Sequence, residues 1–353
     1  MRQSNETKEN KGVVVGKNNG NIYNGMNYTD VKCLCLDLIK DEINKAKQTA
    51  LEIAKQRNEN LMEQVFEKIS LLKITPDMLK KAFEDPSIQM DFLEAEKSYI
   101  KYGTDELCCL LSDILEKRIQ ENGHTLLQIA LGESIKTAPL LLQTQMNTLA
   151  LSFIITQTIS LSVNSHERFK QYLKNAIIPI YNRGVSESNS EFQHLTYSRC
   201  ATITAFSISI VSALGKTYSG LFSKGFTMEN IPNVNDKSLY EKYPSLFTSC
   251  LNEPSKLQIN SINDEKLTET LESLDIDDDD KEKFLSLAKL NKMTESEIKD
   301  KIIELCPEME EIIKYWDKTS ISNLNLSSVG IIIGALTAAK TTTLNYDLHL
   351  WIK

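Results

Sequence analysis

Glycine and proline are scarce in this sequence, with 13 and 8 residues in a chain of 353. Because both residues punctuate the turns of sheet-rich proteins, their scarcity favours helices over a turn-rich β fold. An excess of positive charge is also lacking, and the formal net charge of −8 argues against a general binder of nucleic acid or of anionic membranes. Seven cysteines form an odd number without disulfide or zinc spacing, and residues 1–12 contain no apolar signal-peptide core. Together these absences predict a cytoplasmic protein.

Charge is nearly absent from residues 124–163, which contain only Glu133 and Lys136. Such a run is buried either in a membrane or in a protein core. Its amides, Pro139 and several hydroxyl residues argue against a stable membrane span, which needs about 20 predominantly apolar residues. We therefore expect two core helices, 126–136 and 141–161. The amide side chains of this stretch are Gln143, Gln145, Asn147 and Gln157. If they are buried, they need hydrogen-bond partners within the chain or across a subunit interface.

Length and composition predict a mainly α protein, a multi-helix bundle with a short N-terminal β-hairpin arm and a small α+β C-terminal module. Four regions follow along the chain. Residues 1–28 hold a disordered leader and the hairpin arm, and 29–225 form the helical core domain. Residues 226–263, rich in Asn, Ser and Pro, form an irregular linker, and 264–353 hold an acidic helical segment with a terminal wing-like module.

The arm is predicted from a β-branched run followed by two Asn-Gly pairs, at 19–20 and 24–25. Asn-Gly supplies the positive φ of tight hairpin turns, and a two-stranded hairpin alone is marginal in water. The arm must therefore pack on its own domain or pair with the arm of another subunit, which would make a homo-oligomer. A flexible Gly/Asn leader is the alternative. The oligomerisation candidates are Val13, Val14, Val15, Ile22 and Tyr23.

A long helix is predicted for residues 29–72, where apolar or small residues recur at steps of three and four. At 1.5 Å per residue it would be roughly 60 Å long, which suggests a spine or a helix shared between subunits. Two ordinary helices with a break near 58–60 are the alternative. The periodic positions are Cys35, Ile39, Ile43, Ala46, Ala50, Ile53, Ala54, Leu61, Val65 and Ile69.

Caps, prolines and apolar faces predict the remaining helices. One of them is capped at Asn164 or Ser165 and stops before Pro179. The run 201–214 fits either a helix or a strand, and we favour the helix. Alternation in the last residues predicts a terminal strand that pairs with 323–326. Capping boxes at Ser188/Glu191 and Thr294/Glu297 are expected to start two of the helices that follow. The further helices are expected at 76–83, 87–101, 105–120, 188–200, 281–290 and 295–305.

No motif predicts a cofactor or a metal. Residues 214–217, LGKT, resemble the end of a phosphate-binding loop, but Ile210 stands where that loop requires a glycine. Asp275, Asp277 and Asp279 have the spacing of a calcium loop, yet the glycine and the glutamate that such a loop requires are missing. An acidic start of a helix is expected there instead.

A catalytic site would draw on His166, Glu167, His194 and Cys200, which are residue types that serve as bases and nucleophiles. His194 is the candidate base, with Cys200 or Glu167 as its partner. Six residues do not bring His194 and Cys200 together on one helix, and no second histidine follows His166 at the spacing of a metalloprotease motif.

Gly330 and Gly334 have the spacing of a close-packing helix motif. The uncharged run around them is short for a membrane span, so core packing is expected.

Several segments resemble an uncharacterised family of bacterial cytoplasmic proteins: NNGNIYNGMNYTDVKCLCLDLI, EAEKSYIKYGTDELCCLLSDILEKRI, SVNSHERFKQYL, FQHLTYSRC, SSVGIIIGAL and DLHLWI. The middle and the ending are also distantly similar to the alpha-helical abortive-infection proteins of bacterial phage defence. The resemblance covers most of the chain, its motifs are structural, and it implies no functional residues.

Three functions follow from the sequence and this resemblance. The first is a non-catalytic, self-assembling helical interaction protein, a sensor or effector of antiphage defence with a protein trigger. The second is an enzyme built around His166, His194 and Cys200. The third is a membrane-perturbing effector that releases an apolar segment, such as 327–339.

Overall fold

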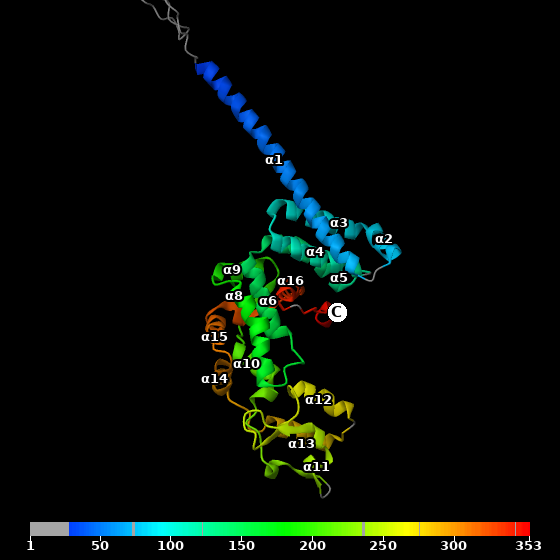
Figure 1. The fold of residues 1–353 in the computed structure, drawn as a ribbon, viewed down its shortest axis with the longest axis vertical. Helices are drawn as coiled ribbons and strands as arrows, with labels where there is room; N and C mark the ends of the chain where they lie inside the picture. Colours follow the sequence, from blue (N-terminus) through cyan, green and yellow to red (C-terminus); the bar gives the residue numbers. More distant parts are fainter. Residues whose placement is uncertain (1–27, 73–74, 122, 235–236, 275, 343) are drawn as a thin grey trace, which may run out of the picture. The chain divides into compact units, whose positions relative to one another are not determined.

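The computed structural model describes residues 28–72, 75–121, 123–234, 237–274, 276–342 and 344–353. The chain divides into two compact units, residues 1–60 and 61–353. Helices dominate the described residues and the strands are short (Figure 1), which confirms the mainly helical class. The predicted hairpin arm, with its candidates Val13, Val14, Val15, Ile22 and Tyr23, lies outside the described residues.

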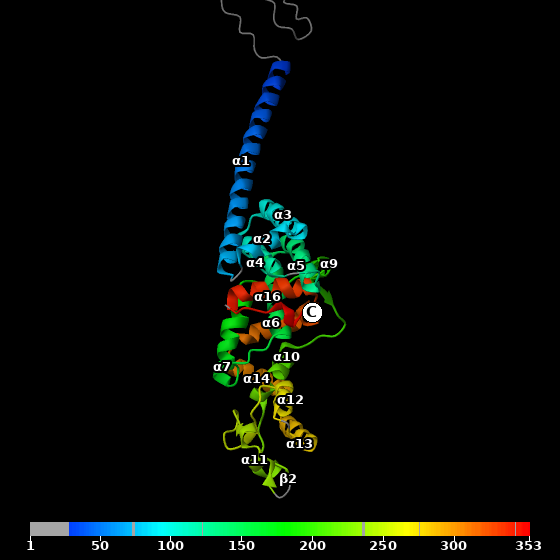
Figure 2. The same ribbon diagram turned by 90° about the vertical axis from the view of Figure 1, so that its right-hand side faces the viewer.

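Helix α1 runs without a break from Tyr28 to Leu71 (Figures 1 and 2). The single long helix is therefore confirmed, and the break near 58–60 is wrong. The helix contains neither glycine nor proline, and its many Lys, Glu, Gln, Ala and Leu residues lose little freedom in a helix. Exposed ion pairs at helical spacing support it, at Asp37–Lys40, Glu42–Lys45 and Lys55–Glu59.

The helices that follow α1 lie close to their predicted positions because local caps set their ends. The side chains of Asp85, Thr104 and Thr125 accept hydrogen bonds from the first turns of the helices that follow them. These helices are α2 (Pro76–Glu84), α3 (Pro86–Tyr102), α4 (Asp105–Gln120) and α5 (Leu126–Thr137).

The low-charge stretch forms core helices, as predicted. Helix α5 is followed by a 3₁₀ turn at Ala138–Leu140 and by α6 (Gln143–Gln157), whose residues 145–155 are all buried. The amides find partners inside the chain: Gln145 Nε2 donates to the carbonyl of Glu191 at 2.8 Å, and Asn147 Nδ2 to that of Gly184 at 2.8 Å. Subunit contacts are therefore not needed to satisfy either amide.

Helix α16 (Ser328–Thr342) packs against α6 in the centre of the unit formed by residues 61–353 (Figures 1 and 2). Its glycines allow the close approach that the sequence predicted. A Cβ atom at Gly330 would lie 1.9 Å from the backbone oxygen of Cys200, and one at Gly334 would lie 2.8 Å from that of Leu149. Core packing is thus the role of both glycines.

The chain does not stop being helical before Pro179, contrary to the prediction. Helix α7 (His166–Tyr172) continues through a π-helical segment, Leu173–Ile177, into α8 (Ile178–Asn182). Pro179 sits in the first turn of α8, where its missing N–H is tolerated. Helix α9 (Asn189–Tyr197) then begins at its predicted cap, Ser188.

The run 201–214 is a strand before it is a helix, so the favoured helix was wrong for its first part. Strand β1 (Ala201–Ile203) precedes α10 (Ile210–Thr217). Strand β6 (Leu324–Leu326) pairs antiparallel with β1, with Ala201 opposite Leu326. The terminal strand was also wrong, since Leu348–Leu350 form a 3₁₀ turn, η7.

Residues 226–287 build a second hydrophobic core, where an irregular linker was predicted for 226–263. Its core includes Phe226, Phe247 and Phe284. Its elements are β2 (Asn233–Val234), β3 (Lys237–Ser238), α11 (Leu239–Lys242), β4 (Phe247–Ser249), β5 (Leu257–Ile259), α12 (Asp264–Ser273) and α13 (Asp278–Lys289). β2 pairs with β3 and β4 with β5, both antiparallel.

Two helices lead from this module back to the bundle core. The Thr294/Glu297 capping box predicted for α14 (Glu295–Leu305) is present. Helix α15 (Met309–Lys318) carries Trp316, which is fully buried and donates from Nε1 to the carbonyl of Ile208 at 2.7 Å.

Candidate functional site

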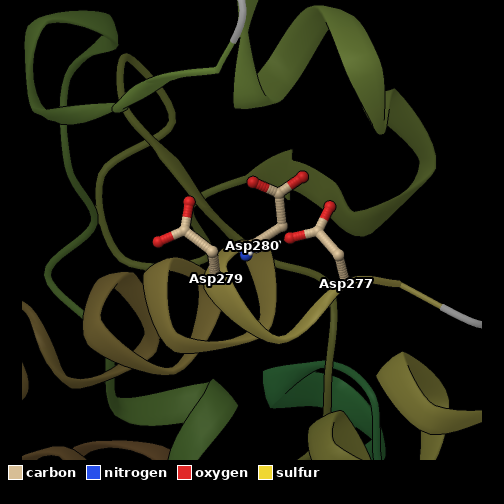
Figure 3. Close-up of side chains that lie close together, drawn as sticks. All are labelled: Asp277, Asp279 and Asp280. Carbon is tan, nitrogen blue, oxygen red and sulfur yellow. Dashed lines mark hydrogen bonds between the residues drawn. The ribbon is translucent and has the colours of Figure 1, made fainter.

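Three carboxylates gather at the start of α13, and they are the only such acidic or metal-ligand group found in the described residues. Asp277, Asp279 and Asp280 project to one side of the first turn (Figure 3), with oxygens within 4.8 Å of one another. Asp277 caps the helix by accepting from the backbone N–H of Asp280 at 2.9 Å. The sequence predicted this acidic helix start.

Two lysines offset much of the charge of the cluster. Asp280 is fully buried, and its carboxylate accepts from Lys242 Nζ at 2.6 Å and from the Tyr243 hydroxyl at 3.2 Å. Lys283 Nζ pairs with Asp279 and also lies 3.4 Å from Asp280. Hydrogen bonding to Asp280 raises the pKa of Lys242, so this ammonium stays charged at neutral pH. The geometry therefore describes an internal ion-pair network that fastens α11 to α13.

His166 and Glu167 lie in the first turn of α7. Burial lowers the pKa of His166, so its ring is neutral at pH 7, and Nε2 lies 3.1 Å from the carbonyl of Leu221. Glu167 accepts from Gln171 Nε2 at 3.3 Å. Both contacts are structural, since the histidine joins α7 to the chain after α10.

His194 and Cys200 lie on and just after α9. His194 Nδ1 is 3.2 Å from Gln145 Oε1, and its Nε2 is 3.4 Å from Ser198 Oγ. Cys200 is fully buried, donates weakly to the carbonyl of Ser198, and has its pKa raised to about 12 by burial. A thiol held protonated in this way is a poor nucleophile. No hydrogen bond in the described part of the chain joins any two of the four catalytic candidates.

The LGKT sequence lies at the end of α10, beside a cavity of about 530 Å³. A phosphate-binding loop precedes a helix, whereas this segment ends one, where the helix dipole disfavours an anion. The cavity is also lined by Asp264 and Lys292, which pair with each other at 2.8 Å. This geometry does not reproduce a phosphate cradle.

The apolar stripe of α1 is buried at one end and exposed at the other. Leu61, Val65 and Ile69 belong to the bundle core. In contrast, Ile39 and Ile43 are 54% and 49% exposed. Leu36, Ala46, Ala50 and Ile53 are exposed as well.

These six exposed positions follow the heptad spacing of a coiled coil. Steps of three and four residues alternate along them, with Leu36, Ile43 and Ala50 at position a and Ile39, Ala46 and Ile53 at position d. Lys32 and Arg57 occupy the next such positions on either side. We call these six residues, from 36 to 53, the α1 seam. The seam is the candidate site, an interaction surface. The sequence predicted a helix that could be shared between subunits, but not which of its residues are exposed.

Comparisons with known proteins add a family and no activity. One protein-family model matches residues 25–352 of the chain. Neither a curated protein nor a solved structure matches it. Within the described ranges, no helix combines the length and the apolar character that a membrane crossing requires.

Proposed function

The chain belongs to the family whose model spans residues 25–352, and because that family is uncharacterised, we propose a function from the geometry of the chain itself. The protein is a non-catalytic, self-assembling helical interaction protein, and it assembles through the α1 seam. The proposal refines the expectation that the N-terminal part of the chain joins subunits.

The exposed apolar seam carries this proposal. Large apolar side chains repeated along one helix face are costly to leave in water and mark an interaction surface. An isolated helix also gains little stability from propensity alone, and most helices in proteins depend on packing of an apolar face. A partner along residues 36–53 would supply that packing.

The solution mass of the full chain tests self-assembly. We expect a mass above that of the 40.0 kDa monomer that falls on dilution, because two alanines make the seam a modest interface. A chain that begins at Asn27 separates the seam from the predicted arm, and we expect it to keep the full assembly. A monomer at every concentration would refute the proposal, and loss of assembly on truncation would assign it to the arm.

A role as sensor or effector in antiphage defence is the second part of the proposal, and it rests on the sequence resemblance. Cells that express the chain should resist at least one phage of a diverse panel. A variant with two charges in the seam, Ile39→Lys/Ile43→Lys, should lose that resistance because assembly is required. Equal plaque formation with and without the chain across the panel would refute the defence role, while the mass measurement would still decide self-assembly.

A further inference from the structure

We propose that the α1 seam joins further copies of this chain as a parallel, in-register coiled coil. This inference rests on the proposed self-assembly and adds the direction and the register of the helices. It follows from the shape of the exposed surface, from the placement of charges beside it and from the residue types at its core positions.

The spacing of the seam residues is that of the hole that receives a knob in a coiled coil. A shallow depression on α1 is lined by Leu38 together with Ile39, Glu42, Ile43 and Ala46. The last four are spaced i, i+3, i+4 and i+7, and four residues of one helix form the hole that receives each knob of a coiled coil. The seam therefore offers the residue spacing that a knob from a second copy of α1 requires.

Charges beside the seam favour parallel helices. Glu42 occupies position g, and Lys40 and Lys47 occupy position e. In a parallel, in-register arrangement, position g faces position e of the next heptad on the neighbour, so that Glu42 faces Lys47 of another copy. In an antiparallel arrangement, positions e face each other and bring lysines together. Glu42 can keep its intrahelical contact with Lys45, at 3.1 Å, through one of its two oxygens.

The core residues favour more than two helices. Isoleucine at position d shifts parallel coiled coils from dimers towards trimers and tetramers, and Ile39 and Ile53 both occupy d. Ala46 and Ala50 bury little area, so the assembly should dissociate measurably on dilution. We infer three or four chains in each assembly.

Distances between spin labels on the full chain test the direction. Cys35 and Thr49 both occupy position g. The first labelled chain carries Cys33→Ser and Cys109→Ser, so that Cys35 is the accessible cysteine among the described residues. The second labelled chain carries the same two substitutions together with Cys35→Ser and Thr49→Cys, so that its label is at position 49. Parallel helices in register place both pairs of labels at the same short distance. Antiparallel helices that share the same seam would separate the Cys35 labels by about 28 Å along the axis and the labels at 49 by about half of that.

Charge exchange gives an independent test. Glu42→Lys should weaken assembly by about 2- to 5-fold, as expected for an exposed ion pair, and Lys47→Glu should do the same. The double variant Glu42→Lys/Lys47→Glu should restore it, because the exchanged charges still face each other. Unequal label distances, or a double variant no better than the single ones, would refute the parallel arrangement and leave self-assembly intact. A monomeric wild-type chain would refute the proposed function as well.

Discussion

At the scale of single residues, ion pairs and burial make polar side chains that could act as ligands or nucleophiles inaccessible. Asp280 is fully buried against Lys242 and Lys283, and Cys200, just after α9, is fully buried as well. Each would be a candidate ligand or nucleophile if it were free. Three predictions follow at this scale.

The first concerns the acidic cluster. Asp280→Ala should lower the free energy of unfolding by about 1–3 kcal/mol, because it leaves the facing lysines without their buried partner. Asp278→Ala is the control: its side chain is 97% exposed, and we expect a loss below about 1 kcal/mol. Urea denaturation measures both. Calcium should leave the wild-type midpoint unchanged, because the lysines already occupy the carboxylates, and a midpoint that rises with calcium would contradict the structural role of the cluster.

The second concerns pH. Hydrogen bonds from Lys224 and from Thr294 lower the pKa of Glu297 to about 2, below its ordinary value of 4.5. A lowered folded-state pKa stabilises the fold above the ordinary value and loses this contribution as pH falls through the folded value. Stability should therefore decline between about pH 5 and pH 2. In Glu297→Gln, which can keep the capping geometry, the decline should be shallower; an identical decline would exclude Glu297 as a cause.

The third concerns thiol reactivity. Cys33 and Cys35 are exposed, and they should react with a thiol reagent in the native protein, as mass spectrometry of the peptides can show. Cys200 should react only after denaturation, because burial raises its pKa to about 12. Rapid native modification of Cys200 would revive the alternative of an enzyme built on that residue. His194→Ala/Cys200→Ala would then be the variant to assay for lost biological activity.

At the scale of elements, close packing of α16 on its neighbours fixes the centre of the bundle. Gly330→Ala should cost about 3 kcal/mol, since its Cβ would meet the backbone of Cys200 at 1.9 Å. Gly132→Ala in α5 is the matched control, because its Cβ would meet only the Asp91 side chain, at 3.2 Å, and that carboxylate need shift by only a few tenths of an ångström beside its partner Arg118; we expect a change within about 1 kcal/mol. Thermal denaturation compares them. Equal thermal midpoints for the two variants would show that α16 can shift without loss of stability, and would contradict the close packing.

Local signals predicted the helices well. The Thr294/Glu297 box and the Ser188 cap act within one turn, so the sequence alone places the ends that they control. The long helix was predictable for the same reason, since its periodicity lies in neighbouring residues. The predicted stripe contained every position of the α1 seam except Leu36, although periodicity alone could not distinguish the exposed half of the helix from the buried half.

Long-range pairing explains what the sequence missed. β1 and β6 pair across more than 120 residues, and no local pattern near Ala201 indicates Leu326 as its partner. The module at 226–287 was missed because short strands between prolines resemble a linker until their aromatic residues pack together. The predicted stop before Pro179 is wrong because a π-helical segment before the proline lets the helical path continue.

At the scale of the whole molecule, the proposed function requires that copies of the chain associate through α1. The most direct test is the solution mass of Ile39→Lys/Ile43→Lys beside that of Leu34→Lys/Leu51→Lys. Both variants add the same charge to exposed apolar positions of one helix, 54% and 49% exposed in the first and 48% and 69% in the second, but only the first pair lies in the α1 seam. We predict that the seam variant is monomeric at concentrations at which the wild type and the control are assembled. A seam variant that keeps the wild-type mass, or a control that loses it equally, would contradict assembly through the seam.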